Sequence, residues 1–239
     1  MMRAQMLGAH GSRGAILSFA DGTVASVVAS YMLARFVVTR KAHHLLWSVG
    51  LALWAASSFG QGSAFVWGWS VASYKIYYFS AILLAGFLGA GTIGLVLRRR
   101  RVFQIFAAYV VGFAALFAVL LALAPVDATL FSQATIGGLA LPSNVRVWTP
   151  FVSIPGGIAF IGGASYSIVR TRRLFAVLIT LGATFPAIGG ILARLGVPWI
   201  LPFTDFAGIV SLSAGVLLAR MPSVAPSASV AATQDLPPS

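Results

Sequence analysis

The sequence predicts an all-α membrane protein, a seven-transmembrane helix bundle with its N-terminus outside and its C-terminus cytoplasmic. Hydrophobic residues make up 59% of the 239 residues and charged residues only 8%, whereas about a quarter of the residues in a soluble domain are charged. The apolar residues fall in continuous runs, each near the roughly 20 residues that a helix needs to cross about 30 Å of hydrocarbon. A transmembrane barrel would instead alternate with a period of two.

The apolar runs divide the chain into seven spans. They cover residues 15–38, 44–65, 74–97, 102–124, 148–169, 174–195 and 198–219, within a transmembrane domain of 15–220. Residues 1–14 form an extracytoplasmic leader that we expect to be retained, because no small-residue cleavage site follows closely. Residues 221–239 are rich in Pro, Ser and Ala and predict a disordered cytoplasmic tail, since such a segment buries too little apolar surface to order itself.

The basic residues orient the bundle. Those that follow the first, third, fifth and last spans are Arg35, Arg40, Lys41, Arg98, Arg99, Arg100, Arg101, Arg170, Arg172, Arg173 and Arg220. The opposite loops hold only Lys75, Arg146 and Arg194. Cytoplasmic loops carry an excess of Lys and Arg, so the larger group predicts the cytoplasmic side of a multi-pass protein in the cell (inner) membrane. The same rule explains the net charge of +12, and we expect no nucleic-acid partner.

Two of the four carboxylates lie inside apolar spans. Asp21 is about six residues into the first span and Asp205 about seven into the last, both counted from the outer side. An ionisable group in hydrocarbon costs several kcal/mol and is rarely kept without a partner or a function. At 1.5 Å per residue, both lie roughly 9 to 11 Å below the outer interface. The cations expected to reach them are Lys75, Arg146 and Arg194.

Tyrosines at the start of the third span are further candidates. Tyr74, Tyr77 and Tyr78 share a helical face by their spacing of three and four residues. Tyr and Trp are common at the membrane interface, so an aromatic belt is one interpretation of this face. If it points inward, Tyr77 and Tyr78 form the wall of a pocket that also contains the aspartates.

Three interpretations of these charged and aromatic residues stay open. In the first, each Asp pairs with a cation or caps bent backbone and holds the bundle in register. In the second, the aspartates and tyrosines bind a small polar or cationic molecule from the outside. In the third, an Asp desolvated by lipid exchanges a proton near neutral pH and couples protons to transport or sensing.

Prolines predict kinks in two spans. Pro155 lies in the fifth span and Pro186 near the middle of the sixth. A proline inside a helix frees the carbonyl four residues earlier, here those of Phe151 and Gly182. Freed carbonyls can line a cavity or bind an ion, although ordinary kinks are commoner.

Small residues recur every four positions in two spans. Gly86, Ala90 and Gly94 form such a face in the third span, and the fifth span has another, formed by Ala159, Gly163 and Ser167. Small residues let two helix backbones approach closely in lipid. The faces predict either seams inside the bundle or contacts of a homo-oligomer.

The composition argues against an enzyme and against a metal or cofactor site. The chain has no Cys and no Glu, so thiolate catalysis and paired-carboxylate catalysis have little material. His43 and His44 are adjacent, and adjacent helical positions do not share a face, so we expect interfacial residues beside Lys41. No phosphate-binding or nucleophile motif lies between a strand and a helix.

The spans and their orientation resemble those of the membrane sensor modules that precede bacterial histidine kinases. They are also similar to microbial rhodopsins, but residues 198–219 contain no lysine to bind retinal. We therefore expect a non-enzymatic sensor or receptor-like bundle with a small-molecule ligand and a cytoplasmic signalling partner. A small-solute or proton-coupled transporter and a structural assembly factor are the alternatives.

Overall fold

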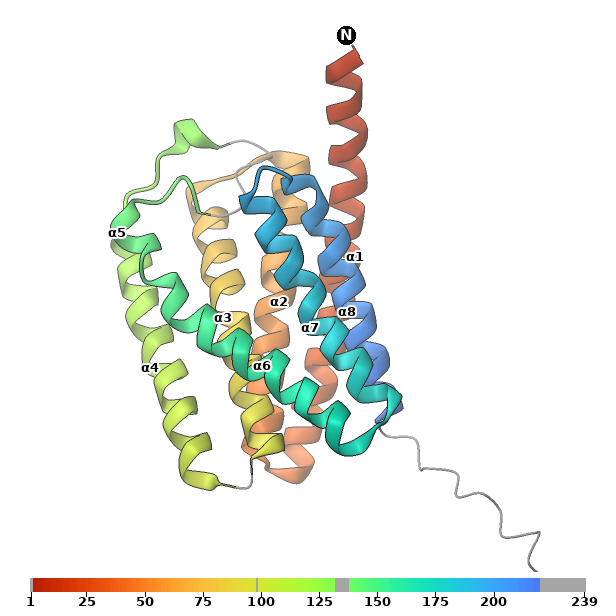
Figure 1. Cartoon of the computed structure of the whole chain (residues 1–239). Coiled ribbons are helices and arrows are strands. Elements are labelled where there is room, and N and C mark those ends of the chain that lie inside the picture. The colour runs from red at the N-terminus through yellow and green to blue at the C-terminus, as the bar shows by residue number, and fades with distance from the viewer. Residues whose placement is uncertain (1, 98, 132–137, 220–239) are drawn as a thin grey trace, which may run out of the picture.

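The computed structural model describes residues 2–97, 99–131 and 138–219 (Figure 1); the predicted tail at 221–239 lies outside this part. Within it, the long helices are α1 (Met2–Thr39), α2 (Ala42–Trp67), α3 (Val71–Val96), α4 (Arg100–Leu123), α6 (Thr149–Thr171), α7 (Leu174–Arg194) and α8 (Leu201–Leu218). The short ones are η1 (Ala128–Leu130), α5 (Ser143–Arg146) and η2 (Pro198–Ile200). The described residues contain no strand, which confirms the all-α prediction.

Six of the long helices are long and apolar enough to cross a membrane. The chain is therefore a helical bundle of the multi-pass membrane type, as predicted, while the number of spans and the orientation stay predictions. α2 is the long helix that does not meet this criterion of length and apolar composition. It carries the buried polar residues Ser48, Ser57, Ser58 and Gln61. Because α2 packs between α1 and α3, these side chains face protein, where their polarity costs less than in lipid.

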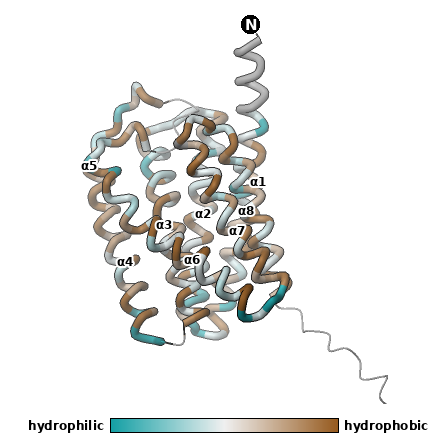
Figure 2. Tube along the Cα trace, viewed as in Figure 1, coloured by the Kyte–Doolittle hydropathy of each residue, from teal (hydrophilic) through white to brown (hydrophobic). Residues whose placement is uncertain are grey.

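The two ends of the helical bundle differ in composition. The α1–α2, α3–α4 and α6–α7 connections lie together at one end with the end of α8, and we call this the arginine-rich end (Figure 1). It includes Lys41, Arg99, Arg172 and Arg173. The α2–α3 and α7–α8 connections lie at the other end, the loop end, together with η1 and α5. Figure 2 shows apolar residues along the helices and hydrophilic ones concentrated at the turns.

Local geometry explains where several helices begin and end. α3 starts with a capping box, in which the Ser70 side chain accepts from the Ser73 backbone N–H and the Ser73 side chain accepts from the Ser70 backbone N–H. These bonds satisfy backbone donors that the first turn leaves unpaired. α1 and α6 end at arginines with left-handed backbone, Arg40 at φ 54° and Arg172 at φ 51°. Both turns fall in the basic segments that the sequence places between spans.

α3 and α6 cross closely inside the bundle, at small residues of both helices. A Cβ placed on Gly89 would lie 2.3 Å from the carbonyl oxygen of Gly156, and one on Gly163 would lie 2.5 Å from Cγ2 of Thr92. The two backbones are therefore in direct contact, as small residues permit. Of the predicted faces, Gly163 and Gly86 lie at this crossing, since a Cβ on Gly86 would lie 2.7 Å from Cγ2 of Val152, whereas one on Gly94 would instead meet Phe103 of α4. Homo-oligomerisation through these faces stays a prediction.

Both prolines lie inside continuous helices, Pro155 in α6 and Pro186 in α7. The carbonyl freed by Pro155 is not left unpaired, because the Tyr109 hydroxyl of α4 donates a hydrogen bond to the oxygen of Phe151. The carbonyl oxygen of Gly182 lies against α8, 3.0 Å from a Cβ placed on Gly208. Each kink thus faces a neighbouring helix.

The Tyr109 hydrogen bond should contribute to the docking of α4 on α6. We expect Tyr109→Phe to lower the free energy of unfolding by about 0.5–1.5 kcal/mol, the net value of one such bond. In a Pro155→Ala background the Phe151 carbonyl regains its own amide donor, so the same substitution should cost much less. Unfolding in sodium dodecyl sulfate, followed by tryptophan fluorescence, measures both values, and an equal cost in the two backgrounds contradicts the assignment.

Candidate functional site

Asp21 is the most deeply buried carboxylate in the described part of the chain. It lies on α1, is 1% exposed and faces α2. The Trp54 indole N–H donates to its Oδ2 at 3.0 Å, and the Ser58 hydroxyl donates to the same oxygen. Its other oxygen, Oδ1, has no hydrogen-bond partner. Buried polar atoms are nearly always paired, so an unpaired carboxylate oxygen calls for an explanation.

A second polar contact lies one helical turn away along the same α1–α2 interface. The Ser18 hydroxyl donates to Oε1 of Gln61 at 3.3 Å, while the Gln61 amide nitrogen has no partner in a side chain that is 3% exposed. An unpaired acceptor and an unpaired donor therefore lie in one buried polar seam. Ions, waters and ligands are the groups that complete such seams.

Sequence reasoning missed the α2 side of this seam, although a signal was present. Trp54, Ser58 and Gln61 are spaced by four and three residues, and so are neighbours on one helical face. Ser18 and Asp21 have the matching spacing on α1. A polar stripe inside an otherwise apolar span predicts a buried interface opposite another polar residue.

α8 brings the second predicted carboxylate to the same place. The carboxyl group of half-buried Asp205 lies close enough to that of Asp21 for their charges to interact. The Tyr77 hydroxyl on α3 also lies within electrostatic range of Asp205. Three predicted site residues from three helices, Asp21, Asp205 and Tyr77, thus lie in one region of the bundle.

The predicted cations are placed differently. Lys75 donates from Nζ to the carbonyl oxygen of Ala122 at 2.9 Å, where a positive charge stabilises the end of α4. Arg146 lies in α5, and its buried Nε has no hydrogen-bond partner; its charge acts on Tyr74. The Arg194 side chain lies outside the described residues. Among the described side chains, none pairs a positive charge with Asp21.

The tyrosine face divides between two surroundings. Tyr77 packs over Gly60 of α2, whose added Cβ would lie 3.1 Å from the Tyr77 Cβ. Tyr74 and Tyr78 instead support the segment after η1: the Ala140 amide donates to the Tyr74 hydroxyl at 3.3 Å, and the Tyr78 ring lies beneath Gly138. Tyr78, predicted as a pocket wall, is thus buried against that segment and Phe117.

Asp21 and Asp205 together have the chemistry of a cation or proton acceptor. Two neighbouring carboxyl groups in a low-dielectric interior repel each other when both are ionised. A proton or a positive charge between them removes that repulsion, and Asp21 Oδ1 is free to accept it. The described residues hold no group of three His, Asp or Glu side chains that could bind a metal ion.

Comparisons of the chain with protein-family models, curated proteins and solved structures find no significant match. The functional interpretation therefore comes from the geometry of the chain itself.

Proposed function

We propose that this protein is a non-enzymatic sensor or receptor-like membrane bundle that binds a small cationic ligand from the outer side, at the carboxyl pair Asp21 and Asp205. The arginine-rich end then faces the cytoplasm, where a signalling partner is reached. The observation that carries the proposal is the Oδ1 oxygen of Asp21, which is buried and unpaired and lies within electrostatic range of a second carboxyl group.

Charge balance favours a cation as the ligand. A buried ionised group is tolerated when a charge of opposite sign neutralises it, and an uncompensated one costs several kcal/mol. Trp54 and Ser58 supply hydrogen bonds to Asp21 but no formal charge. Since the predicted cation Lys75 is engaged with α4, a ligand of positive charge is the group that would complete the site.

Cation-dependent stability tests this proposal. The full chain, purified in detergent, is heated with sodium, potassium, choline, guanidinium or spermidine chloride at constant ionic strength. At least one cation should raise the melting temperature, because a ligand that binds only the folded state adds about 2.7 kcal/mol at 100 times its Kd. Asp21→Asn and Asp205→Asn should lose this stabilisation, and Asp127→Asn, which removes an exposed carboxylate in the loop end, should retain it.

The asparagine variants suit the test because they keep an oxygen that can accept from Trp54 and Ser58 while removing the charge. Two results would count against the site: a panel in which no cation stabilises the wild type, or a shift that all three variants share. Loss of stability in the Asp21 and Asp205 variants without any ligand effect would favour the structural assembly factor.

Transport is the second candidate, and the kink in α7 favours it. A Cβ on Gly208 would lie 2.7 Å from Cγ of Pro186, so the kink packs on α8 one turn beyond Asp205. α7 is continuous through Pro186, but a proline inside a helix frees a backbone carbonyl, and freed carbonyls beside a charged site can line a transport pathway. Flux of the stabilising cation into liposomes that contain only this protein would support a transporter, whereas binding without flux, with a signalling protein that co-purifies, would support a sensor.

A further inference from the structure

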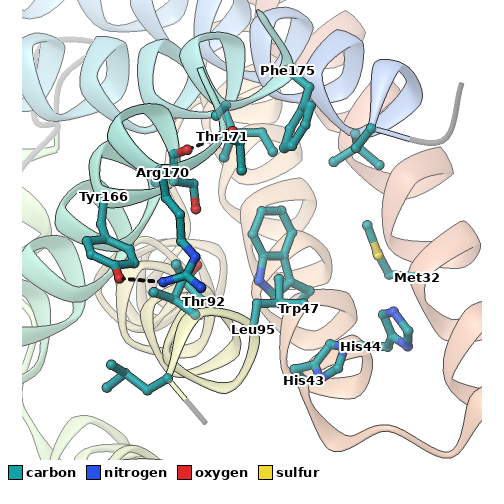
Figure 3. Close-up of a pocket in the computed structure, with 18 of the residues that line it drawn as sticks. Met32, His43, His44, Trp47, Thr92, Leu95, Tyr166, Arg170, Thr171 and Phe175 are labelled. Carbon is teal, nitrogen blue, oxygen red and sulfur yellow. Dashed lines mark hydrogen bonds between the residues drawn. The ribbon is translucent and has the colours of Figure 1, made fainter. Parts of the chain in front are cut away.

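A cavity of about 830 Å³ lies at the arginine-rich end, far along the helices from the carboxyl pair. Six helices contribute to it: α1, α2, α3, α6, α7 and α8. Figure 3 shows Arg170 and Tyr166 of α6 on one side, with Trp47, His43 and His44 of α2 across from them. The two histidines, expected to be interfacial residues, both line this cavity.

The cavity is strongly basic. Arg35, Arg99 and Arg170 line it, and its lining residues include no Asp or Glu. Arg170 donates one hydrogen bond, from Nη1 to the Tyr166 hydroxyl at 3.2 Å. A guanidinium group carries five N–H donors and remains charged at any physiological pH, so most of the donor capacity of Arg170 remains for another acceptor. Three arginines around one cavity that has no carboxylate in its lining are suited to an anion.

Trp47 supplies an independent indication of a ligand. Its side chain lines the cavity and is 4% exposed, yet its indole N–H has no hydrogen-bond partner. The ring is held in place, since it meets Phe160 edge-on at 5.7 Å and closely approaches Gly91. Buried indole N–H groups usually find an acceptor, and a ligand oxygen in the cavity would provide it.

Much of the remaining lining is apolar, although Thr92, Ser167 and Thr171 also contribute hydroxyl groups to it. Besides Trp47, the apolar lining includes Met32, Leu95, Val96, Phe175, Ile179 and Val216. Ligand sites of this size are typically apolar with a few polar groups that fix orientation. The arrangement therefore suits a molecule with an anionic group and an apolar group.

We propose that this cavity binds a phosphate-bearing amphiphile. Arg35, Arg99 and Arg170 hold the phosphate oxygens through charge-assisted hydrogen bonds, a task to which the planar guanidinium group is suited. The Trp47 N–H donates to a further oxygen of the ligand, and its apolar part lies against Met32, Leu95 and Phe175. This chemistry belongs to the headgroup of a membrane lipid and equally to a soluble phosphate ester with an apolar substituent.

Binding to the full chain in detergent, measured by native mass spectrometry, tests the proposal with matched probes. Dioctanoyl phosphatidic acid should bind, whereas dioctanoylglycerol, which lacks only the phosphate, should bind at least tenfold more weakly. Arg35→Gln and Arg170→Gln should each weaken phosphatidic acid binding about tenfold, the effect expected for loss of one charge-assisted interaction. Arg173→Gln is the control, because Arg173 lies in the adjoining turn, outside the lining of this cavity.

Competition by inorganic phosphate separates the two sources. If phosphate displaces phosphatidic acid at millimolar concentration, most of the affinity comes from the phosphate group, and the ligand is a soluble phosphate ester. If phosphate fails to displace it, the acyl chains carry much of the affinity and the ligand is a lipid. Either result supports the proposal.

Two results overturn it: equal binding of the two dioctanoyl probes, or equal losses in Arg170→Gln and Arg173→Gln. Should an arginine variant not fold, Trp47→Phe removes only the N–H and one ring, and weaker phosphatidic acid binding is expected there too. Asp21→Asn should leave this binding unchanged, so the result is independent of the cation site.

Discussion

Alanine at Gly156 should loosen α6 from α3 and lower the stability of the whole bundle. A Cβ at this position would lie 2.6 Å from the carbonyl carbon and oxygen of Ala85 and from the Cα of Gly86. These are backbone atoms of a neighbouring helix, so they cannot rotate away as the end of a side chain can. We expect a cost of about 1–3 kcal/mol, typical of an overpacked core.

The next residue is the control. A Cβ on Gly157 meets no atom within 4 Å, and alanine favours a helix over glycine by up to about 1 kcal/mol. Gly157→Ala should therefore be neutral or stabilising in the same detergent-unfolding assay. Gly89→Ala, which approaches the Gly156 carbonyl from the other helix, should resemble Gly156→Ala, and the two costs should add incompletely because they disturb one contact. Equal effects at Gly156 and Gly157 would contradict the close crossing.

Loss of the Trp54 donor to Asp21 is expected to have the second large effect. Trp54→Phe leaves the buried carboxyl with Ser58 as its remaining hydrogen-bond donor. Oδ2 then loses one of its two donors. A hydrogen bond to a charged group contributes about 1.5–3 kcal/mol, and the free energy of unfolding should fall by about that amount. Trp67→Phe, at the exposed end of the same helix where Trp67 is 77% exposed, should change stability little.

A double-mutant cycle identifies the cause. If the cost of Trp54→Phe comes from Asp21, the substitution should be nearly neutral in an Asp21→Leu background, where neither partner of the hydrogen bond remains. A cost that persists in that background would show that Trp54 acts through packing alone. Thermal unfolding of the four proteins under identical detergent conditions gives the coupling free energy directly.

The helices could be predicted because lipid demands continuous apolar runs, and these are visible residue by residue. The predicted spans 74–97 and 102–124 differ from α3 and α4 by at most three residues at either end. Counting inward from the outer ends of the spans also assigned Asp21 and Asp205 similar depths, and in the structure their carboxyl groups lie within electrostatic range of each other.

The partners of these carboxylates could not be predicted in the same way. Which side chains meet depends on how far each helix is rotated about its axis, and a uniformly apolar run does not encode that rotation. Lys75 lies near Asp21 and Asp205 in depth but faces α4, whereas Trp54 and Ser58 face α1. The arginine-rich cavity was harder still to predict, because its lining comes from six helices.

The position of α2 between α1 and α3 has a consequence for biogenesis. Insertion into the bilayer is most favourable for helices whose own residues are apolar. In the described part of the chain, α2 is the long helix that is not apolar enough to meet this criterion. The serines and Gln61 of α2 can be buried in the membrane at low cost only when other helices shield them from lipid. α2 should therefore enter the bilayer as the second arm of a hairpin with α1, or wait at the translocon until α3 emerges, so that insertion of this chain proceeds by groups of helices.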